Sequence, residues 1–312
     1  LTDGNFNLVL RSSDPGSNCA GTDTTSVDWV TVTVTYRTIK NGGANAAISK
    51  GVCNKADFNF IIDMSGSIGV QDGKPSNLPQ LQAGITDFVN QFSAAGGDGL
   101  YSGTRFSGTS ATTMTTGYDT PASFKSKVAA LSSPSGTTPT ATGIDTGAAN
   151  DSGDRADAPN IMFVVTDGSP NVPGGSLSAP PTWLQAANAA IDSADAARGD
   201  GYVVEAVYLS TAGDPGDTTL PFSPAGDAQW AAAVMKEIGG GHYFPADFKN
   251  FADDLFKALK CAPPPTVDLT KSVDDDSKPE PGGTFTFTLS IKNTSDHEVT
   301  ITALTDTIAL SA

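Results

Sequence analysis

Two different patterns of hydrophobic and polar residues divide the chain into a central part and two flanks. Near the start, residues 28–36 alternate valine and tyrosine with threonine, and near the end, residues 284–291 alternate phenylalanine, leucine and isoleucine with threonine and serine. Strict alternation is typical of strands with one buried face. From Lys55 to about residue 260, continuous apolar runs instead alternate with amphipathic segments. The pattern therefore predicts β-rich flanks around a different central fold.

The central part has the pattern of an α/β fold. Continuous apolar runs predict buried strands at residues 58–62, 161–165 and 202–209, and amphipathic segments predict helices at residues 78–92, 122–131, 182–197, 228–238 and 248–260. The Thr-, Ser- and Gly-rich residues 100–118 predict two edge strands joined by a turn. Buried strands that alternate with helices indicate a doubly wound, mostly parallel, Rossmann-like sheet covered on both faces.

The flanks predict partial all-β sandwich domains. Residues 1–45 are interpreted as the last strands of one such domain, with the glycine-rich residues 41–45 as a flexible link. After the stiff spacer Ala262-Pro-Pro-Pro265, residues 266–312 are interpreted as the first strands of another. So few strands do not form an independent domain. Because the chain begins and ends within strand-like sequence, we expect it to be an internal segment of a longer protein.

Composition narrows the range of partners. The formal net charge is −16 and the isoelectric point is about 4.3, which argues against nucleic acid or an anionic membrane as a partner. No apolar run is long enough to span a membrane, and no signal-peptide pattern opens the chain, so we expect no membrane insertion by this segment. An acidic chain is compatible with the binding of cations.

One pentapeptide carries the chemistry of a metal site. Asp63-Met-Ser-Gly-Ser67 follows the apolar run 58–62 directly. A carboxylate and two hydroxyls at alternate positions, where a buried strand enters a loop, converge on one point. Asp63, Ser65 and Ser67 offer hard oxygen donors, which suit Mg²⁺, Mn²⁺ or Ca²⁺ rather than zinc or copper. A sheet of the expected kind binds its ligands at this end of its strands.

Two further segments complete a resemblance to a known family. Residues 135–144 form a hydroxyl-rich loop that contains Thr138, and residues 161–168 form a second apolar run that ends in Asp167 and Gly168. Together with the pentapeptide they resemble the metal-ion-dependent adhesion site (MIDAS) of von Willebrand factor type A (VWA) domains, over residues 53–261. The alternative is that the hydroxyls are turn and cap residues and the aspartates are surface charges.

The resemblance implies both a ligand set and a function. Its metal ligands would be Asp63, Ser65, Ser67, Thr138 and Asp167, and the cation would be Mg²⁺, with Mn²⁺ or Ca²⁺ as alternatives. We therefore expect an extracellular or cell-surface adhesion module, not an enzyme, that recognises an Asp or Glu carboxylate of a protein ligand or surface receptor. The alternative is a structural module of a surface filament or pilus with a structural or empty site. Residues 266–312 loosely resemble the Ig-like stalk repeats of bacterial surface proteins.

Other sequence features support or qualify this expectation. Cys53 and Cys261 bracket the VWA-like unit, where a disulfide would join its ends in an oxidising compartment; two free thiols are the alternative, and Cys19 is left over. Trp183 and Phe222 are candidate rim contacts, with local packing as the alternative. The tripeptide Arg198-Gly-Asp200 lies where a helix must turn into a strand, so we do not expect it to act in cell recognition.

Overall fold

The computed structural model describes residues 39–48, 50–70, 75–172, 180–210, 214–216, 227–259, 267–274 and 285–294. The strands expected in residues 1–36 lie outside the described residues. No helix in the described part of the chain is long and apolar enough to cross a membrane.

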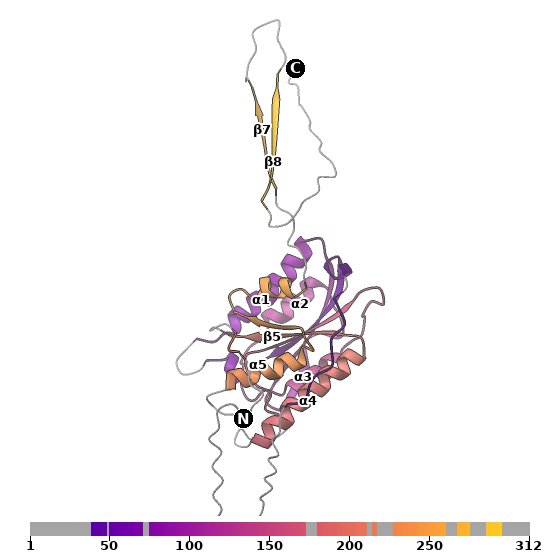
Figure 1. Cartoon of the computed structure of the whole chain (residues 1–312), viewed down its shortest axis with the longest axis vertical. Helices are drawn as coiled ribbons and strands as arrows, with labels where there is room; N and C mark the ends of the chain where they lie inside the picture. The colour runs from indigo at the N-terminus through magenta and orange to yellow at the C-terminus, as the bar shows by residue number, and fades with distance from the viewer. Residues whose placement is uncertain are drawn as a thin grey trace, which may run out of the picture. The chain divides into compact units, whose positions relative to one another are not determined.

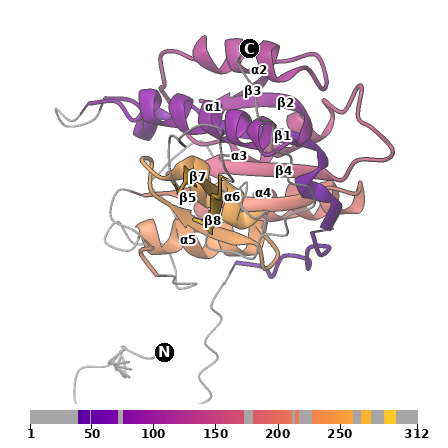
Figure 2. The same ribbon diagram turned by 90° about the horizontal axis from the view of Figure 1, so that it is seen from above.

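A six-stranded sheet with the order β3-β2-β1-β4-β5-β6 forms the centre of an α/β unit (Figure 2). Its strands are β1 (Lys55–Asp63), β2 (Asp98–Ser107), β3 (Ser110–Thr113), β4 (Asn160–Thr166), β5 (Val203–Leu209) and β6 (Tyr243–Ala246). All neighbours are parallel except β2 and β3, which are antiparallel. The predicted α/β fold with a mostly parallel sheet is confirmed. Of the two strands expected at the edge, only β3 lies there, because β2 also pairs with β1.

Helices cover both faces of this sheet (Figure 1). One hydrophobic core lies between the sheet and α1 (Leu78–Ala94), α2 (Pro121–Ala129) and α6 (Phe251–Ala258). A second core lies between the opposite face and α3 (Thr140–Ala148), α4 (Pro180–Gly199) and α5 (Asp227–Ile238). Two short 3₁₀ helices, η1 (Lys50–Cys53) and η2 (Gly66–Ile68), flank β1.

The alternation of side chains along β1 explains why this strand is the centre of the fold. Phe58 and Phe60 enter the first core, whereas Ile61 enters the second. The ring of Phe58 makes an edge-to-face contact with Phe88 of α1, with centroids 5.2 Å apart. A strand that is apolar on both faces is stable only between two helical layers, so the continuous apolar run fixes the position of β1.

Local signals set the helix ends. The hydroxyl of Thr120 caps α2, accepting a hydrogen bond from the backbone N–H of Ser123, and Pro121 occupies the first turn. The last helix begins at Phe251, later than the predicted residue 248. The carboxylate of Asp247 accepts a hydrogen bond of 3.0 Å from the N–H of Lys249, which makes a turn in place of the first helical residues.

The chain order of the strands creates a switch point between β1 and β4. From β1 the chain continues to β2 on one side, whereas β4 is followed by β5 on the other. Ile62 of β1 is paired with Val165 of β4, so the carboxyl ends of the two strands lie side by side. This is the position at which open α/β sheets bind ligands. Asp63 ends β1, and Asp167 follows β4 directly.

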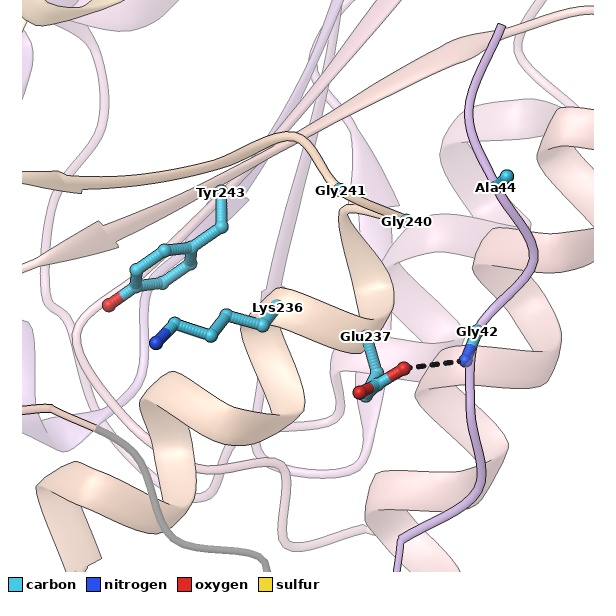
Figure 3. A pocket seen from close by; sticks show the side chains of 7 residues that line it. All are labelled: Gly42, Ala44, Lys236, Glu237, Gly240, Gly241 and Tyr243. Atoms are coloured by element: carbon cyan, nitrogen blue, oxygen red, sulfur yellow. Dashed lines mark hydrogen bonds between the residues drawn. The ribbon is translucent and has the colours of Figure 1, made fainter.

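Residues 39–48, part of which we expected to be a flexible link, are instead held on the α/β unit. The Asn45 amide donates to Gly239 O over 2.8 Å, and its Oδ1 accepts from Val204 N over 3.0 Å. The backbone N–H of Gly42 donates to Glu237 over 2.8 Å (Figure 3). A side-chain amide thus satisfies backbone groups at the start of β5, as a neighbouring strand would do.

Strands β7 (Val267–Val273) and β8 (Phe287–Asn293) pair antiparallel in a separate two-stranded sheet. One of its faces is mainly apolar, with Leu269 opposite Ile291 and Val273 opposite Phe287, and it also carries Lys271, opposite Leu289. Leu269 is 57% exposed and Phe287 is 40% exposed. Residues 266–312 thus contain strands, as expected, and the Ig-like domain that these strands would begin stays a prediction.

Candidate metal centre

Asp63, the first predicted ligand, is a buried carboxylate with neutral hydrogen-bond donors. Its side chain is 0% exposed. One oxygen accepts a hydrogen bond of 2.7 Å from the N–H of Ser65, and the other accepts one of 2.5 Å from the hydroxyl of Thr166. Burial raises the pKa of Asp63 to about 6, although the hydrogen bonds from Thr166 and Ser65 oppose this change. The carboxylate is thus only partly compensated by its protein contacts.

Ser65, Ser67 and Asp167 extend this polar cluster. The hydroxyls of Ser65 and Ser67 are 3.0 Å apart. The hydroxyl of Ser67 donates a hydrogen bond to a carboxylate oxygen of Asp167, across the switch point between β1 and β4. Four of the five predicted ligands therefore form one connected group.

Thr138, the fifth predicted ligand, lies beside this group. A methyl group at Gly168 would lie 3.7 Å from Ser67 Oγ and 3.9 Å from Thr138 Oγ1, so both hydroxyls lie beside Gly168. Two backbone hydrogen bonds of 2.9 Å, from Gly66 to Gly136 and from Ser135 to Met64, join the loop of Thr138 to the turn after β1. The fold thus brings together residues that are far apart in sequence.

The donors present fit a hard divalent cation. The cluster combines carboxylate and hydroxyl oxygens, and within the described residues Asp63 accepts hydrogen bonds from the neutral donors of Ser65 and Thr166. A buried carboxylate without a cationic partner is costly, and a metal ion would offset that cost. In the described part of the chain, no group of three or more His, Cys, Asp and Glu side chains gathers as a metal site, so a cation here would depend on the hydroxyls.

Two supporting residues were not identified from the sequence. Thr166 holds one oxygen of Asp63, and Asn171 accepts a hydrogen bond of 2.7 Å from the N–H of Thr138. The position of Thr166 directly before Asp167, at the end of a buried strand, could have indicated its role. Asn171 lies in a loop whose path the sequence pattern does not reveal.

The structure bears differently on the other residues that the sequence analysis considered for contacts with a partner. Trp183 is 6% exposed and packs in the second core, so the expectation of a rim contact is wrong and the packing alternative holds. Phe222 lies outside the described residues. The side chain of Arg198 is 8% exposed, pairs with Asp195 and donates to Ile238 O over 2.6 Å, so the tripeptide that it begins does not present its arginine to a receptor.

Cys261 and Cys19 lie outside the described residues, so the expected pairing of Cys53 with Cys261 stays a prediction.

Comparison with known proteins supports the resemblance of the α/β unit to VWA domains. The family model of the von Willebrand factor type A domain matches residues 57–207, which supports a VWA domain in the α/β unit. No curated protein sequence matches the chain.

Solved structures of low sequence identity are also similar. The pilus adhesin SpaC from Lactobacillus rhamnosus GG is 16% identical, with a TM-score of 0.52 over 78% of this chain and 36% of its own, which shows a shared fold. Proximal thread matrix protein 1 from the mussel byssus is 18% identical, with a TM-score of 0.46 over 68% of this chain and 48% of its own. The chain thus spans about half the length of the mussel protein, one structure of which has a zinc-occupied MIDAS motif.

A third similar structure is the vWF domain of the type V pili tip protein Mfa5 from Porphyromonas gingivalis. It is 15% identical, with a TM-score of 0.48 over 66% of this chain and 94% of its own.

Proposed function

We propose that this chain is a cell-surface adhesion module that binds an acidic group of a partner protein through a divalent cation. The observation that carries the proposal is the convergence of Asp63, Ser65, Ser67 and Asp167, with Thr138 beside them, at the switch point of the sheet. These residues would hold the cation, Mg²⁺ in the first place. The VWA family match and the fold shared with a pilus adhesin support an interaction module rather than an enzyme.

The donor set explains why such a site would favour a carboxylate ligand. Three of the five proposed ligands are hydroxyls, which carry no formal charge, so this set neutralises a divalent cation less than a set of five carboxylates would. When bound, the cation would supply an electrophilic centre for an Asp or Glu side chain of the partner. The protein's own part is to hold the hydroxyls in place, through the backbone bonds between the turn after β1 and the loop of Thr138.

A structural module of a surface filament is the second candidate. The observation that favours it is the exposed apolar face of β7 and β8, which includes Leu269, Phe287 and Leu289. Exposed apolar faces of this kind are typical of surfaces that pack against other protein. In this case the contacts between modules would form without the cation.

The test uses Mn²⁺ as a paramagnetic probe of the site in the full chain. We expect bound Mn²⁺ to enhance the relaxation of water protons, and an aspartate-containing peptide to reduce this enhancement because its carboxylate replaces a water on the ion. A peptide with asparagine at the same position is the control for the ligand. The variant Asp63→Ala should bind no Mn²⁺ at this site, whereas Asp253→Ala, at an exposed position of α6, should behave as the wild type.

Two results would contradict the proposal. One is unchanged Mn²⁺ binding by Asp63→Ala. The other is an equal effect of the aspartate and asparagine peptides, which would leave the filament module as the better account.

A further inference from the structure

Asn171 makes two hydrogen bonds to the backbone of Thr138, the fifth residue of the candidate metal centre. The N–H of Thr138 donates to Asn171 Oδ1 over 2.7 Å, and the N–H of Asn171 donates to Thr138 O over 3.2 Å. Both backbone groups of Thr138 are therefore bonded to one residue, as in a hydrogen-bonded pair of antiparallel strands, with a side-chain oxygen in place of one carbonyl. The two residues belong to loops that lie far apart in the sequence.

The sequence around Thr138 explains why this residue needs such a partner. Pro139 follows it, and a proline disfavours helical backbone at the preceding residue. Helix α3 begins only at Thr140, so the N–H of Thr138 has no carbonyl acceptor within the helix. Because Thr138 is 5% exposed, this N–H also has little access to water. A buried N–H without an acceptor is costly, and the bond to Asn171 removes that cost.

The hydroxyl of Thr138 depends on this backbone contact for its position. The hydroxyls of Ser65 and Ser67 are 3.0 Å apart, and that of Ser67 also donates to Asp167, so these two side chains are held directly. Among the described residues, the hydroxyl of Thr138 makes no hydrogen bond of its own. Its place beside Gly168 therefore follows from where the backbone of Thr138 is held.

Asn171 is itself tied to the end of β4. It lies shortly after Asp167 in the same loop. The hydroxyl of Thr166 accepts a hydrogen bond of 3.1 Å from the N–H of Gly168 and donates one of 3.2 Å to Gly168 O, which fixes the turn that contains Asp167. Asn171 thus joins the segment of one candidate ligand to the segment of another.

The rest of the Thr138 loop is held without Asn171. The N–H of Gly108, in the turn between β2 and β3, donates to Thr137 O over 3.0 Å, and the hydroxyl of Thr137 donates to Gly108 O. On its other side, the loop is bonded to the turn after β1. Removal of the Asn171 side chain should therefore release Thr138 without unfolding the loop.

We propose that Asn171 is a positioning residue that sets the cation affinity of the candidate metal centre by holding Thr138 in place. The inference rests on the proposed function, and it adds a residue that acts through Thr138 rather than on the cation. A ligand group that is held in place before binding loses little entropy when the cation binds. Without the bond to Asn171, the hydroxyl of Thr138 would sample other positions, and the cation affinity would fall.

The test is a titration of the full chain with Mn²⁺, followed by water-proton relaxation. Asn171→Ala should weaken Mn²⁺ binding about fivefold, the size of effect that one neutral hydrogen bond supports. The matched control is Asn150→Ala. Asn150 Oδ1 also accepts a backbone N–H over 2.7 Å, from Gly117, but it lies beyond the opposite end of α3. The control should also lose stability, yet it should bind Mn²⁺ as the wild type does.

A double-mutant cycle shows whether Asn171 acts through Thr138. Thr138→Val removes the hydroxyl and nearly keeps the shape of the side chain. If Asn171 only positions that hydroxyl, adding Asn171→Ala to Thr138→Val should weaken Mn²⁺ binding by less than about twofold. A purely structural role of Asn171 would give the same loss of affinity in both backgrounds.

Amide hydrogen exchange in EDTA examines the contact without a cation. The N–H of Thr138 should exchange at least about fivefold faster in Asn171→Ala than in the wild type, because it loses its acceptor. Asn171→Asp keeps an acceptor oxygen and should retain the protection. Asn150→Ala should leave the exchange of this N–H unchanged.

These results separate the inference from the proposed function. Wild-type affinity in Asn171→Ala, an equal loss of affinity in Asn150→Ala, or an undiminished effect in the Thr138→Val background would overturn the inference and leave the metal site in place. If Asn171→Ala fails to fold, Asn171→Leu, which keeps the shape of the side chain without an acceptor, decides by the same criteria. No Mn²⁺ binding by the wild type would instead reject the proposed function, and this inference with it.

Discussion

The two ends of the α/β unit are both rich in carboxylates, yet these carboxylates differ in burial and in spacing. At the carboxyl ends of β1 and β4, Asp63 is fully buried and connected through Ser65 and Ser67 to Asp167 by short contacts. At the opposite end, a cavity of about 550 Å³ between α3 and α4 is surrounded by four exposed aspartates, Asp145, Asp151, Asp154 and Asp200. Close, partly neutral oxygens suit a single ion, whereas the exposed aspartates around the cavity form no group of three or more within the described residues that could hold a metal ion. Spacing and burial, rather than the number of acidic residues, distinguish the two ends.

Arg155→Ala should have the largest effect, and it should act on the acidic end. Arg155 forms an ion pair of 2.6 Å with the fully buried Asp57, so its loss leaves an uncompensated buried charge and should lower the free energy of unfolding by about 3–5 kcal/mol. Urea unfolding measures this difference. The control is Lys55→Ala, which removes an exposed ion pair with Asp157 and should cost less than about 1 kcal/mol. Similar losses of stability in both variants would show that Arg155 does not stabilise the fold through its ion pair with Asp57.

Thr166→Val should act on the metal end alone. It removes the hydroxyl that donates to Asp63 over 2.5 Å, so we expect a loss of about 1–3 kcal/mol in EDTA, together with weaker Mn²⁺ binding. Thr104→Val is the matched control, because Thr104 is also buried but its hydroxyl has no partner among the described residues. That change should cost little or should stabilise the fold. If Thr104→Val is the more damaging variant in urea unfolding, the hydrogen bond to Asp63 does not have the role assigned to it.

The double change Asp151→Asn with Asp200→Asn should have the smallest effect on stability, and the opposite sign. Removing two of four like charges relieves repulsion, so the free energy of unfolding should rise by less than about 1 kcal/mol at low salt. The gain should disappear at high salt because of screening. Thermal unfolding at two salt concentrations checks this. A loss of stability that persists at high salt would mean that the carboxylates support the fold by interactions other than charge.

The sequence predicted the metal end much better than the acidic end for a physical reason. Four of the five candidate ligands follow apolar runs, where the fold places the ends of strands, so residues 58–63 and 161–167 indicated both strands and the polar residues that follow them. Thr166 was missed because its role depends on the direction in which its hydroxyl points. The acidic cavity depends on the packing of α3 against α4, and no local pattern specifies which aspartates that packing brings together.

Residues 39–48, which precede the sheet, also show that tertiary contacts decide what the local sequence cannot. Its glycines predicted a flexible link, because local composition favours many conformations. The structure holds it through Asn45, whose amide contacts Val204 and Gly239, residues that lie far away in the sequence. Tertiary hydrogen bonds overrode the local tendency, as the second hydrophobic core did for Trp183.

The central claim, that the polar cluster after β1 binds a divalent cation, is tested most directly by anomalous scattering from crystals of the chain soaked in Mn²⁺. We expect a strong peak among the hydroxyls of Ser65, Ser67 and Thr138, close to Asp63 and Asp167, and no peak in the acidic cavity between α3 and α4. The peak should be absent from crystals of Asp63→Ala. A peak in the acidic cavity alone, or none at the cluster at saturating Mn²⁺, would contradict the account.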